Sequence, residues 1–188
     1  LAPFLQVAPV MAEVLRLSGD IASIGLQGVA KIATDPTFQR GLIGLFEGAK
    51  ATGRQSDSIM LEMWEKFVFL CTLAAMSTLF RNTVGNIVVA PEGEAIIREC
   101  FAECIAVAKA SGYAPRADYV ERMTGFLVEK GAPRKGSMAR DIERGNRVEA
   151  DHIVGDMLER ARALGVAAPV LRISYNALKA YEAARESA

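Results

Sequence analysis

The sequence has few of the residues that bind metals or form disulfide bonds. It holds one histidine, His152, and three cysteines, Cys71, Cys100 and Cys104, among 188 residues. An odd number of cysteines without a framework spacing favours reduced thiols, and therefore a cytoplasmic protein. Cys100 and Cys104 are four residues apart, but a zinc site needs about four nitrogen or sulfur ligands. We expect these cysteines to belong to the core and predict no metal site.

The chain also lacks an excess of charge and a long apolar segment. Lys plus Arg and Asp plus Glu both number 22, so no basic field favours nucleic-acid binding. The nearly uncharged run from Phe67 to Phe80 is shorter than the ~20 residues that span a bilayer, which predicts a buried helix and no membrane partner. No basic region precedes the apolar residues at Leu1 to Leu5, so a secretory signal is unsupported.

A glycine-rich Gly-x-Gly-x-x-Gly dinucleotide loop is missing from the whole sequence. Before residue 55, two apolar runs flank the turn Ser18-Gly19-Asp20 and predict strands at 10–17 and 26–33. After them, apolar residues recur at helical spacing from Phe38 to Lys50, which predicts a helix that Gly53 would end. One strand pair and one helix do not complete a nucleotide-binding sheet. We therefore interpret residues 1–54 as the remnant of an α/β domain.

After residue 55 the pattern becomes helical throughout. Ser56 or Asp57 can cap a helix from Ser58 to about Phe80, and Pro91 fits the first turn of a helix that ends near Ser111. Further helices are predicted from Asp118, from Ser137 to Arg144, from Val148 to Leu164, and after Pro169, with Gly145 and Gly165 as stops. Short connections between successive helices predict a bundle.

Lys66 lies near the start of the apolar helix, beside Trp64 and Phe67. A lysine with a partly buried stem can have a lowered pKa and serve as a proton donor to a carbonyl. Alternatively, Lys66 snorkels and keeps its ammonium group in water. The spacing alone leaves both interpretations open.

Ser137 follows Gly136 in a loop that contains Pro133, Arg134 and Lys135. Its hydroxyl can cap the helix that runs to Arg144. A hydroxyl beside free backbone amides at a helix start also suits a substrate carboxylate. The two roles are compatible.

Glu149 and Asp151 fall in the first turn of the helix predicted from Val148. Acidic residues are favoured there by the helix dipole, whatever else they do. His152 has no nucleophile or metal ligand beside it in the sequence, and we interpret it as a surface or helix-packing residue.

Two separated motifs and the residues after them form an ordered set. Trp64-Glu65-Lys66-Phe67 opens the apolar helix, and Gly136-Ser137-Met138 opens a later one. The other members are Gly85, Asp141, Gly145, Glu149, Asp151 and Gly155. In this order and spacing they resemble the C-terminal half of ketopantoate reductase, also called 2-dehydropantoate 2-reductase. The resemblance covers about residues 55–180.

The resemblance implies an N-terminal Rossmann domain followed by a helical domain, with the active site in the cleft between them. Residues 1–54 would be the end of the NADP-binding Rossmann domain, and residues 55–188 the helical substrate-binding and dimerisation domain. The expected fold class is therefore mainly α, a helical bundle preceded by a short α/β remnant.

The same resemblance implies NADPH-dependent reduction of a 2-keto acid, foremost ketopantoate to pantoate on the way to pantothenate and coenzyme A. Lys66 would protonate the developing alkoxide, Ser137 would bind the substrate carboxylate, and Glu149 would contact the cofactor ribose. Helix faces rich in Leu, Met and Phe favour a homodimer. The chain alone is expected to be inactive. The rival hypothesis is a non-catalytic helical binding or assembly module, which the missing cofactor loop favours.

Four positions depart from the family pattern. Members specific for ketopantoate carry an Asn one turn after the lysine and an Asn-Pro pair one turn later, where this chain has Leu70 and Ala74-Ala75. A further Asn is expected before Gly85, where this chain has Val84. A site that selects substrate through hydrogen bonds loses selectivity when those polar groups are missing. The reductase class is compatible with these changes, and a different 2-keto acid substrate is an alternative.

Overall fold

The computed structural model describes residues 37, 56 and 58–187, most of them in a compact unit formed by residues 60–188. The helices are α5 (Ile59–Leu79), α6 (Val84–Val88), α7 (Gly93–Ala110), α8 (Ala117–Leu127), α9 (Ser137–Glu143), the π-helical turn η1 (Asp151–Gly155), α10 (Asp156–Ala163) and α11 (Pro169–Glu186). No strand occurs between residues 58 and 187, which confirms the helical fold class. The strands and helix predicted within residues 1–54 lie outside the described residues, and the domain boundary stays a prediction.

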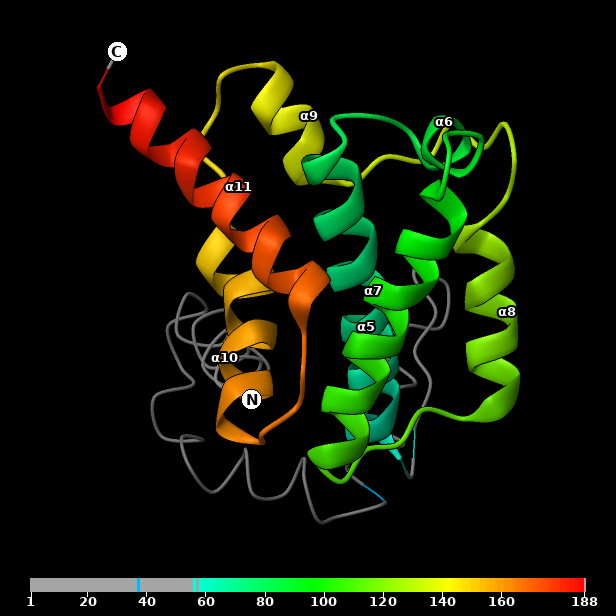
Figure 1. The fold of residues 1–188 in the computed structure, drawn as a ribbon. Coiled ribbons are helices and arrows are strands. Elements are labelled where there is room, and N and C mark those ends of the chain that lie inside the picture. The colour runs from blue at the N-terminus through cyan, green and yellow to red at the C-terminus, as the bar shows by residue number, and fades with distance from the viewer. Residues whose placement is uncertain (1–36, 38–55, 57, 188) are drawn as a thin grey trace. The chain divides into compact units, whose positions relative to one another are not determined.

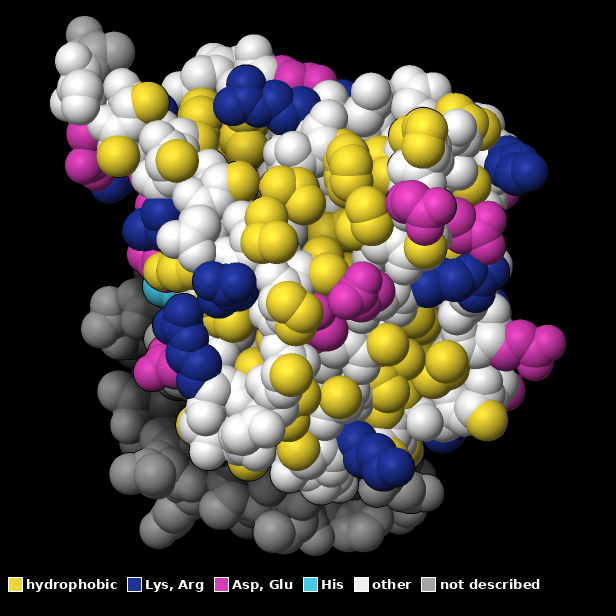
Figure 2. Space-filling model, in the orientation of Figure 1, with side chains coloured by type: hydrophobic (Ala, Val, Ile, Leu, Met, Phe, Trp, Pro, Cys, Tyr) yellow, Lys and Arg dark blue, Asp and Glu magenta, His cyan; other side chains and the backbone are white. Residues whose placement is uncertain are grey.

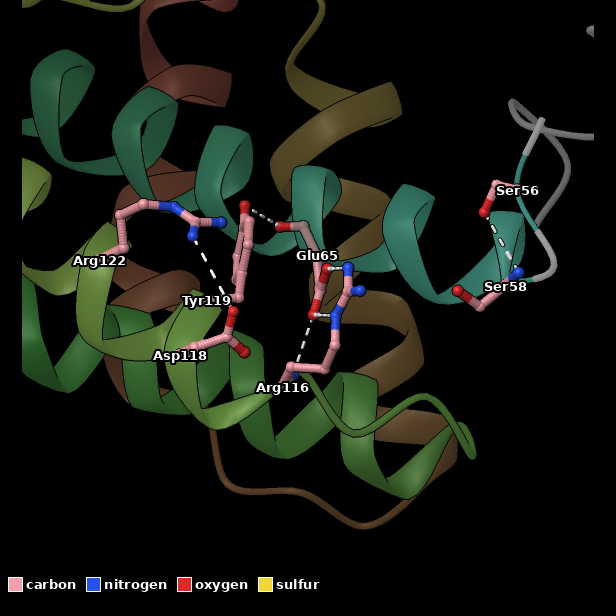
Figure 3. Close-up of polar contacts among 7 residues, drawn as sticks. All are labelled: Ser56, Ser58, Glu65, Arg116, Asp118, Tyr119 and Arg122. Atoms are coloured by element: carbon pink, nitrogen blue, oxygen red, sulfur yellow. Dashed lines mark hydrogen bonds and ion pairs between the residues drawn. The ribbon is translucent and has the colours of Figure 1, made fainter. Parts of the chain in front are cut away.

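Most of the predicted helix limits agree with the structure. The backbone amide of Ser58 donates to the hydroxyl of Ser56 at 3.2 Å, just before α5 begins (Figure 3). Gly145 and Gly165 follow the ends of α9 and α10 with φ of 71° and 67°, values that glycine adopts without strain. Pro169 opens α11, where its missing N–H is not needed by the helix.

The helix predicted from Ser58 to about Phe80 ends at Leu79, in agreement with the prediction, and Gly85 lies inside the separate helix α6. Two limits were predicted wrongly. Pro91 precedes α7 instead of lying in its first turn, because α7 begins at Gly93. The helix predicted from Val148 begins at Asp151 as a π-helical turn and becomes α-helical at Asp156.

Helix α7 packs against α6, α8, α10 and α11, so it lies at the centre of the bundle (Figure 1). Its buried residues recur at intervals of three and four, the spacing of one helix face. They include Ile97, Cys100, Phe101, Cys104 and Val107. This helix supplies much of the core that the other helices cover.

The three cysteines are free and buried together, as predicted from their positions. Hydrogen bonding to Cys104, together with burial, raises the pKa of both Cys71 and Cys100. The thiol of Cys71 donates to the backbone carbonyl of Ile153 in η1, at 3.8 Å. Protonated thiols act in such a core as small apolar side chains.

A buried carboxylate joins α7 to α11. Glu103 accepts hydrogen bonds from the amides of Val170 and Leu171, each at 2.9 Å. These amides belong to the first turn of α11, whose own N-cap residue, Ala168, has no side chain that can accept them. Burial raises the pKa of Glu103, and the two amide hydrogen bonds oppose that effect. Glu103 therefore caps a helix that begins 66 residues later in the chain.

A second buried carboxylate joins α5 to the start of α8. Glu65 is 2% exposed and pairs with the guanidinium group of Arg116 through both oxygens (Figure 3). The backbone amide of Arg116 donates to Glu65 at 2.9 Å, and the hydroxyl of Tyr119 donates to the Glu65 carbonyl at 2.7 Å. Hydrogen bonding to Arg116 lowers the pKa of Glu65. The pair fixes the residue immediately before Lys66.

Helix α6 holds the loop that precedes Ser137. The amides of Val84 and Gly85 donate to the carbonyls of Arg134 and Ala132, at 2.8 and 3.0 Å. A Cβ atom at Gly85 would lie 2.5 Å from the backbone nitrogen of Ala132, well inside contact distance. Only glycine permits this approach of two backbones. Among the described helices, none is long and apolar enough to cross a membrane.

Replacing Glu65 with Gln should destabilise the protein by roughly 2 kcal/mol near neutral pH, because hydrogen bonds to a charged group are lost. The matched control is Glu94→Gln, which breaks an exposed pair with Arg98 and should cost no more than about 0.5 kcal/mol. Urea unfolding measures both. Since the Glu65 pKa is lowered in the folded state, its contribution is present above pH 4.5 and lost as the pH falls. A difference between wild type and Glu65→Gln that persists undiminished in acid would contradict this account.

Replacing Gly85 with Ala should lower the free energy of unfolding by about 2 kcal/mol, because the new methyl group overlaps the backbone at Gly131 and Ala132. Gly125 is the control, since a Cβ atom there meets nothing within 4 Å. As Gly125 lies within α8, Gly125→Ala should be neutral or stabilise by up to about 1 kcal/mol. Equal unfolding midpoints for the two variants would refute the close packing at Gly85.

Candidate functional site

Lys66 lies on the outer face of α5, between two buried residues of the same helix. Trp64 and Phe67 turn into the core, while the side chain of Lys66 is exposed. Leu70 is one turn further along the same face and is 41% exposed. Within residues 58–187 the ammonium group of Lys66 has no hydrogen bond or ion pair. The structure thus places this group in solvent, as in the snorkelling interpretation, and leaves it free to meet a ligand.

Gly136, the residue before Ser137, contacts α5 further along the helix than Lys66. The amide of Gly136 donates to the hydroxyl of Ser77 at 3.1 Å, and a Cβ atom at Gly136 would lie 3.4 Å from the Cα atom of Ala74. Ser77 is eleven residues after Lys66, which is three helical turns or about 16 Å along α5. Gly136 therefore contacts α5 about three turns from Lys66.

The structure does not support Ser137 as an N-cap. Gly136 takes the N-cap position of α9, Ser137 is the first helical residue, and no side-chain capping hydrogen bond forms. Gly136 can take this position because its extended backbone fits against Ser77, where a side chain would clash. Ser137 is exposed, and its hydroxyl has no partner in the described part of the chain. The hydroxyl is available for a ligand instead of a cap.

Glu149 lies outside any helix, in the connection from α9 to η1, and it is exposed. It lines a surface cavity of about 440 Å³ together with His152, Lys179 and Tyr181. His152 is also exposed, in agreement with its interpretation as a surface residue. The amide of Ile153 donates to the carbonyl of Glu149, and Ile153 in turn meets Cys71 of α5. The Glu149 segment is thereby tied to α5.

The three predicted site residues lie on different elements: Lys66 on α5, Ser137 at the start of α9, and Glu149 before η1. Neither Lys66 nor Ser137 is among the described residues that line the Glu149 cavity. No hydrogen bond or ion pair in residues 58–187 joins any two of the three. Lys66 and Ser137 stay candidate groups for the substrate, and Glu149 lines a polar cavity beside η1.

The cavity wall contains a network that the sequence did not reveal. The hydroxyl of Tyr175 donates to Asp151 at 2.6 Å, and the Lys179 ammonium group donates to both Asp151 oxygens at 3.2 Å. These hydrogen bonds lower the pKa of Asp151, and the bond to Asp151 raises the pKa of Tyr175. The partners are 24 and 28 residues apart, so the only local signal was the four-residue spacing of Tyr175 and Lys179.

The exposed side chains of Lys66, Ser137 and Glu149 can donate a proton and form hydrogen bonds with a ligand. The exposed ammonium group of Lys66 can give a proton to an oxygen anion, and the Ser137 hydroxyl can hydrogen-bond a carboxylate. The carboxylate of Glu149 can accept hydrogen bonds from hydroxyl groups of a ligand. Among residues 58–187, no cluster of three or more His, Cys, Asp or Glu side chains can hold a metal ion.

Residues 58–182 match the family model described as "Ketopantoate reductase PanE/ApbA C terminal". The chain is 32% identical over 144 residues to the uncharacterized oxidoreductase YkpB of Bacillus subtilis, covering 77% of this chain and 48% of that protein. It is 29% identical over 157 residues to the 2-dehydropantoate 2-reductase of Pyrobaculum aerophilum, covering 84% of this chain and 56% of that protein. The chain thus spans about half the length of these curated relatives.

Solved structures show the same likeness. The ketopantoate reductase of Ralstonia eutropha aligns with a TM-score of 0.71 at 27% identity, over 78% of this chain and 49% of that one. The 2-dehydropantoate 2-reductase of Methylococcus capsulatus aligns with a TM-score of 0.67 at 28% identity, over 78% of this chain and 46% of that one. The helical fold, the matched span and these relatives agree with the resemblance that the ordered motifs carry. The chain belongs to the ketopantoate reductase family and contains its helical C-terminal domain.

Proposed function

We propose that this chain is the substrate-binding half of an NADPH-dependent oxidoreductase that reduces the carbonyl group of a 2-keto acid. The observation that supports the proposal is that the Lys66 ammonium group and the Ser137 hydroxyl group are exposed and have no hydrogen-bond partner among residues 58–187. A proton donor and a carboxylate-binding group are the two functions that reduction of a 2-keto acid demands of this domain. The oxidoreductase class agrees with the named relatives.

Lys66 is proposed as the catalytic proton donor. As negative charge develops on the carbonyl oxygen, the ammonium group stabilises it and transfers a proton to form the alcohol. The Glu65–Arg116 pair holds the preceding residue in the core, and Lys66 itself is exposed. Ser137 is proposed to hydrogen-bond the substrate carboxylate and thereby orient the keto group toward Lys66.

Glu149 is proposed to contact the ribose of NADPH. The cavity that it lines is polar and contains Tyr181 and Lys179, which suits a hydroxylated ligand better than an apolar one. When bound, the nicotinamide supplies the hydride that reduces the carbonyl carbon. The residues of this chain would bind the ribose and the keto acid and supply the proton.

Ketopantoate is the first substrate to test, because the relatives are named for it. The surface beside Lys66 supports testing other 2-keto acids as well. Leu70 and Ala74 offer no hydrogen-bonding side chain, and Val84 is buried with its amide bonded to Arg134. Leu70 can pack against a hydrocarbon side chain but cannot bond a substrate hydroxyl.

We further propose that the complete protein is a homodimer. A structurally similar ketopantoate reductase from Staphylococcus aureus is described as dimeric, and its TM-score is 0.71. Hydrophobic side chains gather over the middle of the face drawn in Figure 2, with charged residues around them and acidic side chains among them. Ile173 on α11 is 54% exposed, and Val89 after α6 is 66% exposed. Exposed apolar area of this kind marks association surfaces.

Lys66→Ala in the full-length gene product should lower kcat for keto-acid reduction roughly 10²–10⁴-fold, the usual contribution of a general acid. The dissociation constant for NADPH should stay unchanged, because Lys66 does not line the Glu149 cavity. Steady-state NADPH oxidation and NADPH titration measure the two quantities. Lys109→Ala, at an exposed lysine near the end of α7, is the control and should keep full turnover.

If Lys66→Ala has the same kcat as the unaltered protein, Lys66 is not the proton donor. If the unaltered full-length protein neither binds NADPH nor reduces any 2-keto acid, the chain instead belongs to a non-catalytic helical binding module.

Leu70→Asn should raise the ratio of kcat/KM for ketopantoate to kcat/KM for trimethylpyruvate by at least about tenfold. These two keto acids differ only in one hydroxyl group, which the new amide can bond and Leu70 cannot. Because Leu70 is partly exposed, the change should leave the melting temperature nearly unaltered. A ratio that does not move would show that position 70 does not contact the substrate side chain.

A further inference from the structure

The segment that carries Glu149 has little structure of its own. After α9 ends, Gly145 turns with a φ of 71°, and residues 146–149 belong to no helix. Within the turn, the amide of Asn146 returns to the carbonyl of Asp141 at 2.8 Å. A short exposed connection of this kind takes its conformation from its neighbours.

The last part of α11 holds the N-terminal end of this segment. The hydroxyl of Tyr181 donates to the carbonyl of Asn146 at 2.7 Å, and the Nε atom of Arg185 donates to the carbonyl of Gly145 at 2.8 Å. Tyr181 and Arg185 are one turn apart and therefore lie on one side of α11. Both contacts end on backbone carbonyl groups, so they fix the path of the chain itself.

The same helix holds the other end of the segment. Tyr175 and Lys179 bond Asp151, two residues after Glu149. The Tyr175 ring also packs against Gly155, where a Cβ atom would lie 2.9 Å from its Cε2 atom. Gly155 closes the π-helical turn η1, and such turns often occur at functional sites. The Glu149 segment is thus bonded to α11 before and after Glu149.

We propose that Tyr181 and Arg185 are positioning residues for Glu149: together with the Asp151 contacts, they hold residues 145–151 so that the Glu149 carboxylate faces the cavity. This inference rests on the proposed role of Glu149 in binding the NADPH ribose. Tyr181, Arg185 and Lys179 themselves line the cavity, so the residues that fix the segment also form the wall opposite it. Their loss would let Glu149 move away without disturbing the core.

The test is a double-mutant cycle in the full-length gene product, read as the dissociation constant for NADPH. Tyr181→Phe removes only the hydroxyl group and should weaken NADPH binding roughly fivefold, as expected for one ordering hydrogen bond. In a Glu149→Ala background the same change should have no further effect, because no carboxylate remains to be positioned. Arg185→Ala is the second variant and should behave in the same way.

Asn176→Ala is the matched control. Asn176 lies on the same helix, and its side chain bonds the carbonyl of Arg172, within α11 itself. Its replacement should leave the NADPH dissociation constant unchanged. Amide hydrogen exchange of the free protein gives a readout without cofactor: Tyr181→Phe should speed exchange in residues 146–150 and leave α5 and α7 unchanged.

The outcomes separate the two proposals. If Glu149→Ala weakens NADPH binding but Tyr181→Phe and Arg185→Ala do not, the positioning role is wrong and the role of Glu149 stands. If Tyr181→Phe weakens binding equally with and without Glu149, the tyrosine acts by another route and the inference is overturned. If Glu149→Ala leaves NADPH binding unchanged, the ribose contact fails and the positioning role fails with it.

Discussion

The carboxylate of Glu103 on α7 accepts the free amides at the start of α11, and this contact determines where α11 lies against the core. A helix start that is buried without such a partner would leave unpaired donors away from water, at a cost of about 1–3 kcal/mol each. Because Glu103 fixes the first turn, the later turns of α11 reach the connection that carries Glu149. The cavity beside η1 thus depends on a contact made at the opposite end of the helix.

The other part of the site depends on α5 in a comparable way. Trp64, Glu65 and Phe67 enter the core, and the Glu65–Arg116 pair ties this part of α5 to the start of α8. Burying a carboxylate is costly unless both oxygens are paired, and here the guanidinium group and one backbone amide satisfy them. Three turns further along α5, the hydroxyl group of Ser77 accepts a hydrogen bond from the amide of Gly136, the residue before Ser137. Lys66, the predicted proton donor, and Ser137, the predicted substrate-binding residue, thus each follow a residue that contacts within the fold hold in place.

The two halves of the site differ in how they are held. Lys66 projects from a long helix whose buried side chains leave it one orientation, whereas Glu149 lies on a short connection held by exposed hydrogen bonds. Contacts of the second kind contribute little to global stability, since water competes for the same groups. They can still set the geometry on which cofactor binding depends, because small displacements of a binding group reduce its effect strongly. Functional segments are typically held in position by contacts that contribute little to the global stability of the protein.

The helical class, most helix limits, the buried cysteines and the family could be predicted from the amino-acid sequence, because periodicity, capping residues and motif order are local properties of the chain. The sequence also indicated Lys66, Ser137 and Glu149 as site residues. Three features became visible in the folded chain alone: Gly85 lies within α6, Gly136 takes the N-cap position of α9, and Tyr181 and Arg185 hold the segment before Glu149. These features depend on contacts between residues far apart in the chain: Gly136 meets Ser77 across 59 residues, and Arg185 meets Gly145 across 40. Contacts of that range leave no local pattern, since either partner alone resembles an ordinary surface or turn residue.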